Sequence, residues 1–483
     1  MTQEMQWDSR LSFIFAMVGA AVGLGNIWRF SYVLYSNGGG SFFIPYFIAI
    51  AIMGIPFLLL EYSIGFSFKR PFSDILKKIN PKYEFIAWVL VLFVFIVVIY
   101  YMVILSWDFI YFLSSFNFAW GSDVVGYFIN SVGGGSNLNK ASSIIFQTSF
   151  GVIVMWFVIW YISHKDIDKG IGKFSKVLIP LLFIIMGFII IYSLTLPGAE
   201  IGINALLTPD WSKLLDVNIW LAAFSQIIFS LSMGQAIATT YASYLPENSR
   251  LSDNALIVVA SNSAFEIFTA FGVFSILGCM SASSGMPIVQ LVTEGTGLIF
   301  MVLPMIFNQM GLVGHIFAPL LFLAILFAGI TSAIGFLEPL LSSSTHKFNI
   351  SRKKAATYLS IIGCICSLML TTGIGSYLVQ IIDTLVNEFG ILLLIGIQCV
   401  IFGWVYGLDD LISLLNENGI LKVGKVWKGI IKYILPIFIF IIWTLGIISL
   451  FTNEGIFTLT IDILIIVVVL VVSFILTKDK STG

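Results

Sequence analysis

The sequence predicts an all-α polytopic membrane protein with twelve transmembrane helices, and three observations support this class. Hydrophobic residues make up 59% of the 483 residues and charged residues only 10%, whereas a soluble protein carries about 25% charged residues. The mean hydropathy is +1.02. Apolar runs of about 18 residues or more recur along the whole chain, and each is long enough to cross a bilayer.

Each predicted helix corresponds to one apolar run. In chain order the twelve runs cover residues 11–35, 42–68, 85–117, 143–163, 171–195, 218–244, 254–282, 315–345, 354–372, 376–404, 430–450 and 457–477. The third run is longer than the bilayer is thick, so we expect that helix to be tilted. The first run is too long for a signal peptide and lacks a cleavage-like site.

Basic residues predict the orientation, because cytoplasmic connections of membrane proteins are enriched in lysine and arginine. An even number of helices leaves both termini on one side, and most basic residues fall at the termini or in the connections on that side. The opposite connections hold only Lys140 and Lys213. We therefore expect a multi-pass protein of the cell membrane, with residues 1–10 and 478–483 in the cytoplasm.

The first apolar run contains an unusual central stretch, Gly19-Ala-Ala-Val-Gly-Leu-Gly-Asn26, followed by Arg29. Glycine weakens a helix, and freed backbone groups are tolerated in a membrane only inside protein or beside a wet cavity. One interpretation is a helix that breaks at mid-membrane and offers its backbone to a polar ligand. The other is a straight helix whose glycines allow close packing. This stretch by itself favours neither interpretation.

The sixth apolar run repeats this feature, with Phe229-Ser-Leu-Ser-Met-Gly-Gln-Ala236 at its centre. The two interrupted runs occupy corresponding places if residues 11–195 and 218–404 form two halves of five helices each, with residues 430–477 as two additional helices. Paired interrupted helices in two halves are the best sequence indication of a transporter site. The connection 284–314 is long and apolar, and we expect it to fold back over an outer mouth.

Several motifs, in order along the chain, resemble those of the neurotransmitter:sodium symporter family. They are Gly19-Ala-Ala-Val-Gly-Leu-Gly-Asn-Ile-Trp-Arg-Phe30, Asn37-Gly-Gly-Gly40, Ile44-Pro-Tyr46, Thr208-Pro-Asp210 with Trp220, Thr240-Tyr-Ala-Ser-Tyr244 and Ala328-Gly-Ile-Thr-Ser332. The similarity runs from Trp7 to the last apolar run and is strongest to prokaryotic members such as the bacterial leucine transporter. The resemblance implies a 5+5 inverted repeat with helices 1 and 6 broken, plus two extra helices.

The resemblance also implies two sodium sites built from oxygen ligands, which a hard cation prefers. The first site would use Ala21, Asn26, Ser230 and Asn262 with the substrate carboxylate; the family usually has threonine at the place of Ser230. The second site would use Gly19, Val22, Ala328, Thr331 and Ser332. Without the resemblance, Thr331 and Ser332 would be interpreted as hydroxyls bonded to their own helix.

The substrate carboxylate is expected at the backbone N–H groups of Leu24 and Gly25, where a half-helix begins and its dipole favours an anion. Monoamine transporters carry aspartate at the place of Gly23, so the glycine favours an amino acid over a bare amine. The resemblance implies that the substrate-binding residues are Ala21, Gly23, Leu24, Gly25, Val97, Tyr101, Phe229, Ser230, Ser232, Gln235, Ser332 and Phe336. Gln235 replaces an aromatic residue; it predicts either a polar substrate side chain or a bond to the freed backbone.

Two gates are implied, one on each side of the substrate. The outer gate would consist of Arg29, Asp383, Tyr101 and Phe229, because an intramembrane arginine needs a partner. At the inner gate the family commonly has an arginine near the N-terminus and an aspartate after helix 8, but this chain has Glu4 and His346. That pair would be reversed in sign, with Lys347 assisting, or absent. Trp7, Ser243, Tyr244 and Glu338 are expected to complete the inner gate.

Glu266 predicts independence from chloride. Animal members of the family generally need Cl⁻ beside the first sodium site, and Tyr46, Gln226, Ser230 and Asn262 match the positions that line it. Chloride-dependent relatives carry serine at the place of Glu266, which lies four residues after Asn262 and so on the same helix face. An ionised Glu266 would supply the negative charge that chloride supplies elsewhere. If Glu266 takes up a proton once Na⁺ leaves, the empty carrier returns with H⁺.

We therefore expect sodium-coupled symport of a neutral amino acid by alternating access across the cell membrane, with two Na⁺ sites, no chloride requirement and no enzymatic activity. The substrate and the lipid bilayer are the expected partners, and nothing in the sequence indicates nucleic acid. One alternative is a non-transporting amino-acid sensor on the same scaffold, which would need a signalling domain or long tail. A channel would need a continuous polar stripe along several helices, whereas polar residues here cluster at mid-membrane.

Overall fold

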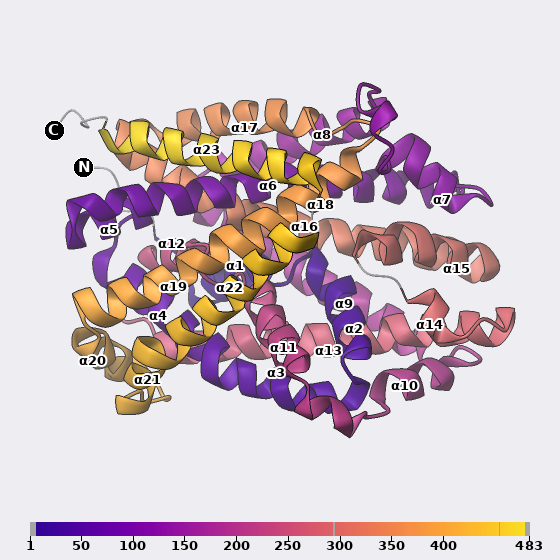
Figure 1. The fold of residues 1–483 in the computed structure, drawn as a ribbon, viewed down its shortest axis with the longest axis horizontal. Helices are drawn as coiled ribbons and strands as arrows, with labels where there is room; N and C mark the ends of the chain where they lie inside the picture. The colour runs from indigo at the N-terminus through magenta and orange to yellow at the C-terminus, as the bar shows by residue number, and fades with distance from the viewer. Residues whose placement is uncertain (1–5, 293–294, 454, 479–483) are drawn as a thin grey trace.

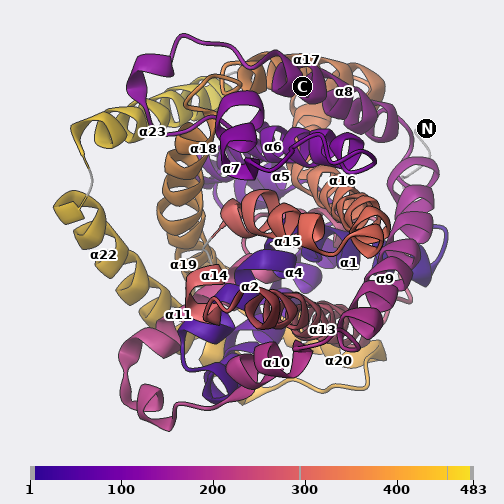
Figure 2. The same cartoon turned by 90° about the vertical axis from the view of Figure 1, so that its right-hand side faces the viewer.

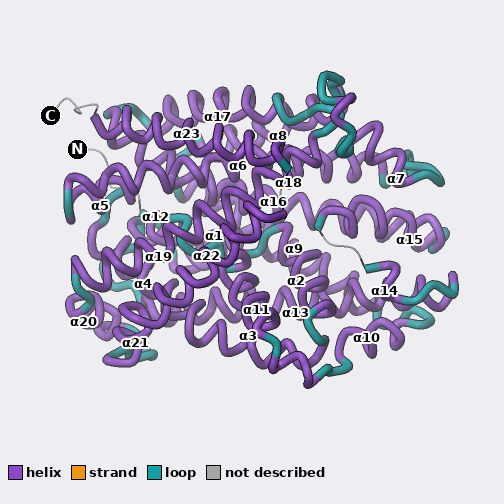
Figure 3. Tube along the Cα trace, in the orientation of Figure 1, coloured by secondary structure: helices purple, strands orange, loops and turns teal. Residues whose placement is uncertain are grey.

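The computed structural model describes residues 6–292, 295–453 and 455–478. The regular secondary structure of this part of the chain is helical, with loops between the helices (Figure 3), and its one isolated β-bridge joins Ile144 to Thr372. The α-helices are α1 (Arg10–Ala21), α2 (Leu24–Ser36), α3 (Phe43–Ala49), α4 (Ile55–Phe68), α5 (Phe72–Ile79), α6 (Glu84–Ser114), α7 (Val124–Tyr127), α8 (Phe146–Ser163), α9 (Lys173–Ser193), α10 (Ala199–Leu207), α11 (Val217–Ser230), α12 (Ile237–Ser243), α13 (Leu251–Ser284), α14 (Ile288–Leu291), α15 (Leu303–Gln309), α16 (Leu312–Phe348), α17 (Arg352–Leu368), α18 (Gly375–Thr384), α19 (Leu392–Val400), α20 (Asp409–Asn418), α21 (Lys425–Gly429), α22 (Leu435–Asn453) and α23 (Ile456–Lys478).

The predicted class of membrane protein is confirmed. Within the described residues, nine helices are long and apolar enough to cross a membrane, and the bent pair α1–α2 adds a tenth. The predicted runs 218–244 and 354–372 correspond to α11 with α12 and to α17; α11 has 14 residues and α17 has 17, too few for the same criterion. The total of twelve spans and the inverted repeat stay predictions.

The helices form a bundle with central and peripheral members. In their most apolar windows, 83% of the span that contains α6 and 78% of α16 are buried, against 22% for the span of α22 and 17% for α23. Figure 2, which looks along the bundle, shows α22 and α23 at its edge. The largely buried α6 and α16 are therefore the elements against which a central site can be built, while the apolar surfaces of α22 and α23 are mostly exposed.

The two ends of the bundle differ. Figure 1 shows α5, α20 and the end of α23 at one end, and α7, α14, α15 and α10 at the other. The connection that contains α14 and α15 packs on α6 and on the connection after it: the rings of Trp107 and Phe300 lie edge-on at 6.0 Å, and the Trp120 indole donates to Asn308 Oδ1 at 2.9 Å. Its place over an outer mouth stays a prediction.

The first helix is broken, which excludes the straight-helix interpretation. The axes of α1 and α2 differ by 53° across Val22 and Gly23. Gly23 is extended, with φ −111° and ψ −169°, and its N–H donates to Asn26 Oδ1 at 2.9 Å. The asparagine therefore caps the second half-helix in the way that an N-cap residue satisfies a free donor.

The sixth helix is also broken, because residues 231–236 separate α11 from α12. Ser232, Gly234 and Ala236 have positive φ values of 48°, 72° and 59°. Such values are uncommon for residues other than glycine, and strained backbone of this kind is concentrated at functional sites. Both sequence-predicted interruptions are therefore present and leave backbone groups available at the centre of the bundle.

Candidate functional site

The break in the first helix lies against α16. The Ser332 hydroxyl donates to the Gly19 carbonyl at 3.0 Å and lies 3.4 Å from the Val22 carbonyl. A Cβ added to Gly19 would lie 2.9 Å from Cβ of Thr331, so only glycine permits this approach. Ser332 therefore bonds across to the broken helix instead of to its own.

Thr331 behaves differently, since its hydroxyl donates to the Ala328 and Phe327 carbonyls, each at 3.0 Å. Its bonds are thus those of the back-bonding alternative, although its side chain touches Gly19. The structure brings together all five residues predicted for the second sodium site. Their neutral carbonyl and hydroxyl oxygens form a donor set of the kind that suits a hard monovalent cation.

The residues predicted for the first sodium site form a buried chain of side chains. Asn26 Nδ2 donates to Asn262 Oδ1 at 2.8 Å, and Asn262 Nδ2 donates to the Ser230 hydroxyl at 3.0 Å. Ala21 is the last residue of α1, so its carbonyl lacks a partner in the helix. Two amide oxygens, a hydroxyl and a free carbonyl thus lie at the joint between α1 and α2.

Glu266 lies beside this chain and is fully buried. Its carboxylate accepts from Tyr46 at 2.6 Å, from Gln226 Nε2 at 2.8 Å and from Asn26 Nδ2 at 3.2 Å. The sequence-based grouping of Glu266 with Tyr46 and Gln226 therefore matches the geometry. Burial disfavours the charged form of this carboxylate, and the three donors directed at it offset part of that cost.

The space for a substrate lies next to the start of α2. The Leu24 N–H lies 3.5 Å from the Tyr101 hydroxyl, and a Cβ added to Gly25 would meet no atom within 4 Å. The Tyr101 ring packs edge-on against Phe336 at 5.4 Å. The N-terminus of a helix, where N–H groups lack partners within the helix and the dipole is positive, favours a carboxylate in open space beside it.

The other predicted pocket residues occupy different places. Val97 is buried on α6, and Phe229 and Ser230 end α11. The Ser232 hydroxyl donates to the Ala20 carbonyl at 3.1 Å and so links the two broken helices. Gln235 is 5% exposed, and its side-chain oxygen has no hydrogen-bond partner within the described part of the chain. Gln398 on α19, which sequence reasoning missed, donates instead to the Gly234 carbonyl at 3.0 Å.

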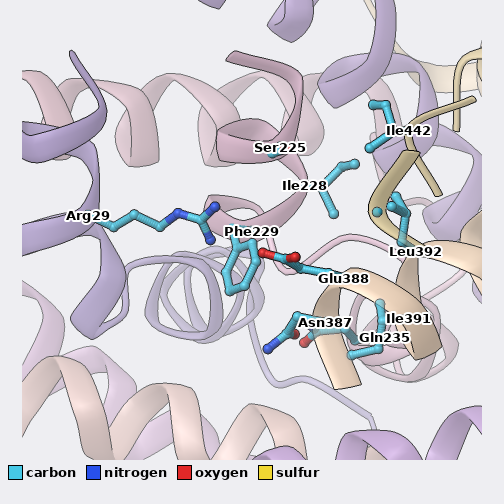
Figure 4. Close-up of a pocket in the computed structure, with 11 residues that line it drawn as sticks. Arg29, Ser225, Ile228, Phe229, Gln235, Asn387, Glu388, Ile391, Leu392 and Ile442 are labelled. Atoms are coloured by element: carbon cyan, nitrogen blue, oxygen red, sulfur yellow. The ribbon is translucent and has the colours of Figure 1, made fainter. Parts of the chain in front are cut away.

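A cavity of about 150 Å³ lies beside these residues; its lining includes Arg29, Phe229, Gln235, Asn387 and Glu388. The Arg29 guanidinium lies over the Phe229 ring, 3.9 Å from its centroid. Figure 4 shows that the Glu388 carboxylate also points toward this ring. A charge stacked on the lid of the predicted substrate site is consistent with an outer gate.

The predicted acidic partner of Arg29 lies on α18. Asp383 accepts from Asn387 Nδ2 at 2.9 Å, and the same amide donates to the Tyr100 hydroxyl at 2.9 Å. Glu388, five residues along the chain, lines the cavity with Arg29 and was not singled out by the sequence. The gate therefore contains two candidate carboxylates where the sequence indicated one.

At the other end of the bundle, a network of buried polar groups closes the space beneath α12. Arg352 donates to both oxygens of Glu338, at 2.6 and 2.7 Å, and its Nε donates to the Lys165 carbonyl at 2.8 Å. The Tyr244 hydroxyl donates to Glu338 at 3.0 Å. Trp7 joins this network, because its indole donates to the Tyr241 carbonyl at 2.8 Å. Ser243 bonds its own helix at the Thr240 carbonyl.

The predicted pair of Glu4 and His346 has one member outside the described residues and stays a prediction. Glu4 lies outside the described residues, and His346 Nδ1 lies 3.4 Å from Asp74 on α5. Lys347 pairs with Glu84 at 2.8 Å. The bidentate Arg352–Glu338 pair was missed because Arg352 belongs to a basic run that the sequence explains by orientation alone.

The start of α1 is held by a second set of charges. The Ser12 hydroxyl donates to Asp8, and Lys176 pairs with the same carboxylate at 3.0 Å. The Ser12 hydrogen bond, assisted by Lys176, lowers the pKa of Asp8 from its ordinary value. Arg10 Nε donates to Asn254 at 2.7 Å. The first half-helix is thereby attached to α9 and α13 at the end that must move if the inner gate opens.

Two further buried carboxylates were passed over by the sequence reasoning. Glu61 on α4 and Asp108 on α6 are 1% and 0% exposed. An ionisable residue inside an apolar run is by default a candidate functional residue, and this rule is the signal that identifies both.

The geometry is accompanied by similarity to known transporters. Residues 4–131 and 121–478 match the model of the sodium:neurotransmitter symporter family. An uncharacterized sodium-dependent transporter of Methanocaldococcus jannaschii is 38% identical over 435 residues, 89% of this chain and 88% of that protein. A sodium-dependent dopamine transporter of Caenorhabditis elegans is 27% identical, over 88% of this chain and 77% of that protein.

Among solved structures, that of MhsT in complex with L-phenylalanine is similar, with a TM-score of 0.77 and 30% sequence identity. The match covers 92% of this chain and 100% of the MhsT chain. The matched family is one of membrane transporters that use sodium. From the family match along almost its whole length and the relative at 38% identity, we conclude that the chain belongs to the sodium:neurotransmitter symporter family.

Proposed function

We propose that this sodium-coupled symporter carries a neutral amino acid and that the carboxylate of the amino acid binds at the joint between α1 and α2. The observation that supports this most is the open space at Gly25 in the first turn of α2, where the Leu24 N–H has only a 3.5 Å contact with the Tyr101 hydroxyl. Gly23 leaves no side-chain charge there; an added Cβ would lie 3.1 Å from the Ser332 hydroxyl, so an aspartate would crowd the site. The amino-acid complex of the similar MhsT structure supports the same substrate class.

Uptake into proteoliposomes tests the proposal. A panel of radiolabelled amino acids would be offered with an inward Na⁺ gradient, with equal Na⁺ on both sides, and with K⁺ in place of Na⁺. We expect concentrative uptake of one or a few neutral amino acids only with the gradient. Uptake that is equal in all three conditions, or limited to amines without a carboxylate, would overturn the proposal.

Coupling follows from shared ligands. In the proposed first site, Asn26 and Asn262 would hold Na⁺ together with the substrate carboxylate, so each favours the binding of the other by the same free energy. The proposed second site, at Gly19, Val22 and Ser332, would hold α1 against α16 while it is occupied. Release of that Na⁺ would free the first half-helix.

Alternating access would then require the two ends to open in turn. At the outer end, Arg29 over Phe229 and Tyr101 beneath would separate the substrate from the cavity. At the inner end, the buried Glu338–Arg352 pair with Tyr244 and Trp7 would have to separate. Proton return on Glu266 stays a prediction, which a pH-sensitive dye inside the vesicles would test.

The pocket residue Gln235 should set substrate choice. Gln235→Leu removes a buried amide oxygen that has no protein partner within the described residues, so we expect a severalfold change in which amino acids compete while Na⁺ dependence is retained. Competition by a panel of unlabelled amino acids measures it. Gln398→Leu is the matched control, because that amide bonds backbone at Gly234 and should affect all substrates alike. An unchanged profile in Gln235→Leu would make its role structural.

The outer gate should depend on coupling between Arg29 and a carboxylate of α18 or the segment after it. We expect Arg29→Ala and Asp383→Ala to be non-additive in transport rate, with a coupling energy of about 1 kcal/mol or more. The parallel cycle with Glu388→Ala separates the two candidate partners. If the losses of Arg29→Ala and Asp383→Ala are additive, and those of Arg29→Ala and Glu388→Ala are not, Glu388 is the partner of Arg29 in the gate.

A further inference from the structure

A second cavity lies far from the transport site, between α5 and the last turn of α16. Its volume is about 450 Å³, within the range of about 300–1,000 Å³ that is typical of small-ligand sites. We call it the α5–α16 basic pocket; its lining consists of Arg70, Asp74, Lys77, Lys78, His346 and Lys347. Four of these six side chains are lysine or arginine, and a fifth, His346, is positively charged when protonated. The pocket therefore suits an anionic ligand.

The charges are arranged around a buried base and an open rim. Lys347 is 8% exposed and donates to Glu84 at 2.8 Å, and Lys77 pairs with the other oxygen of Glu84 at 3.1 Å. Arg70 and Lys78 are exposed at the rim. Glu84 and Asp74 offset only two of the four lysine and arginine charges, so an excess of positive charge remains before His346 is protonated.

A basic surface alone would not indicate a site, because any connection that faces the cytoplasm is rich in lysine. Elsewhere at this end of the bundle, however, basic side chains pair singly with acidic ones at the surface, as Lys176 does with Asp8 and Lys428 with Asp409, or lie over aromatic rings, as Lys432 does over Trp404. Here they surround a hollow, and one of them is buried at its base. The convergence distinguishes this pocket from a solvated basic face.

We propose that the α5–α16 basic pocket binds the phosphate of an anionic phospholipid headgroup. A membrane lipid is favoured over a soluble phosphate because Phe348, next to Lys347 in the last turn of α16, is 45% exposed and available to an acyl chain. Basic pockets between membrane helices on the cytoplasmic side are suited to such headgroups. The assignment to the cytoplasmic leaflet rests on the proposed orientation of the symporter.

Such a lipid would act on transport through α16. This helix carries Thr331, Ser332 and Glu338, and its last turn forms one wall of the pocket, while α5 forms the other. A bound headgroup would hold the two elements together at the end that contains the Glu338–Arg352 pair. We therefore expect anionic lipid to change the transport rate without changing which amino acids are carried.

The direct test measures lipid binding to the purified full-length protein by native mass spectrometry. The protein would be titrated with phosphatidylglycerol or phosphatidylcholine, each at the same concentration. We expect wild type to retain phosphatidylglycerol preferentially, and Arg70→Gln with Lys78→Gln to lower this affinity roughly 30-fold, since each basic residue near an anionic headgroup contributes about fivefold. Both substitutions are at exposed positions, so the fold should be preserved.

The matched control is Lys82→Gln, which removes the same charge from an exposed position close by in the chain but outside the pocket. It should bind lipid like wild type. Equal binding of phosphatidylglycerol by wild type and the Arg70–Lys78 double variant would overturn the proposal. So would thermal stabilisation of wild type by inorganic phosphate without any preference for phosphatidylglycerol, which would identify a soluble anion as the ligand.

A second arm uses transport in vesicles of phosphatidylcholine alone or of phosphatidylcholine with phosphatidylglycerol. The transport rate of wild type, and likewise that of Lys82→Gln, should differ between the two lipid compositions. The transport rate of the double variant should be the same in both. The binding arm is measured in detergent and does not depend on orientation or on transport. Failure of the proposed function would therefore leave lipid binding intact, whereas failure of this inference would leave amino-acid uptake intact.

Discussion

Glu266→Ser should convert transport from chloride-independent to chloride-dependent. In wild type, the buried carboxylate accepts from Tyr46, Gln226 and Asn26 and lies one side chain away from the proposed first sodium site. Removal of the carboxylate leaves these donors without a charged acceptor, and a hydrogen bond to a charged group contributes about 1.5–3 kcal/mol. We expect uptake by the variant in gluconate to fall roughly 30-fold or more, and chloride to restore much of it.

Chloride replacement by gluconate measures this effect, at constant Na⁺ and constant substrate. Glu266→Asp is the control that keeps the charge, and it should remain active in gluconate. Glu266→Gln keeps the size without the charge, so its activity in gluconate should fall as well. The proposal is wrong if wild type itself loses activity in gluconate, or if Glu266→Ser transports equally well with and without chloride.

Asn26→Ala should weaken substrate binding and its sodium dependence together. The Asn26 side chain caps Gly23, donates to Asn262 and donates to Glu266, so its loss disturbs the helix joint, the proposed sodium ligands and the charge beside them. With one ion-holding oxygen and one cap removed, a loss of about 2–3 kcal/mol corresponds to a decrease in substrate affinity of roughly 30- to 150-fold.

Binding of the labelled substrate over a series of Na⁺ concentrations measures both quantities. Asn262→Ala should shift the same two quantities, because Asn262 bonds both Asn26 and Ser230. Thr331→Ala is a useful comparison: it should shift the Na⁺ dependence, whereas Leu24 and Gly25 would still hold the carboxylate. Retention of wild-type sodium dependence by both asparagine variants would disprove the assignment of the first site.

Local patterns were informative wherever one segment carries the whole signal. The apolar runs predict the helices because insertion in a bilayer depends on the hydropathy of each segment by itself. The two interrupted helices were predictable for the same reason, since Gly19–Asn26 and Phe229–Ala236 carry their own helix-breaking residues. The motif spacing around Asn262 and Glu266 correctly indicated one helix face.

Apart from the groupings that the family resemblance implied, interactions between distant segments were not predictable. Arg352 pairs with Glu338, and His346 pairs with Asp74. Both basic residues belong to a basic stretch of the sequence, which does not indicate which of several acidic residues is the partner. Glu388 and Gln398 were missed because nothing in the run 376–404 indicates which of its polar residues face a cavity or a broken backbone. Buried charges find partners by proximity in space, and the packing of the bundle decides that proximity.

The sequence by itself therefore determined that this protein is a membrane bundle of the sodium:neurotransmitter symporter family, with two broken helices at its centre. These features can be inferred from each segment separately, because hydropathy and helix-breaking residues are local properties of the sequence. Only the tertiary structure decided that Ser332 bonds the broken helix while Thr331 bonds its own, that Arg352 pairs with Glu338, and that Arg70 and basic side chains of α5 and α16 surround one pocket. These outcomes depend on how helices far apart in the chain pack together, and the direction of a side chain within a bundle is set by that packing.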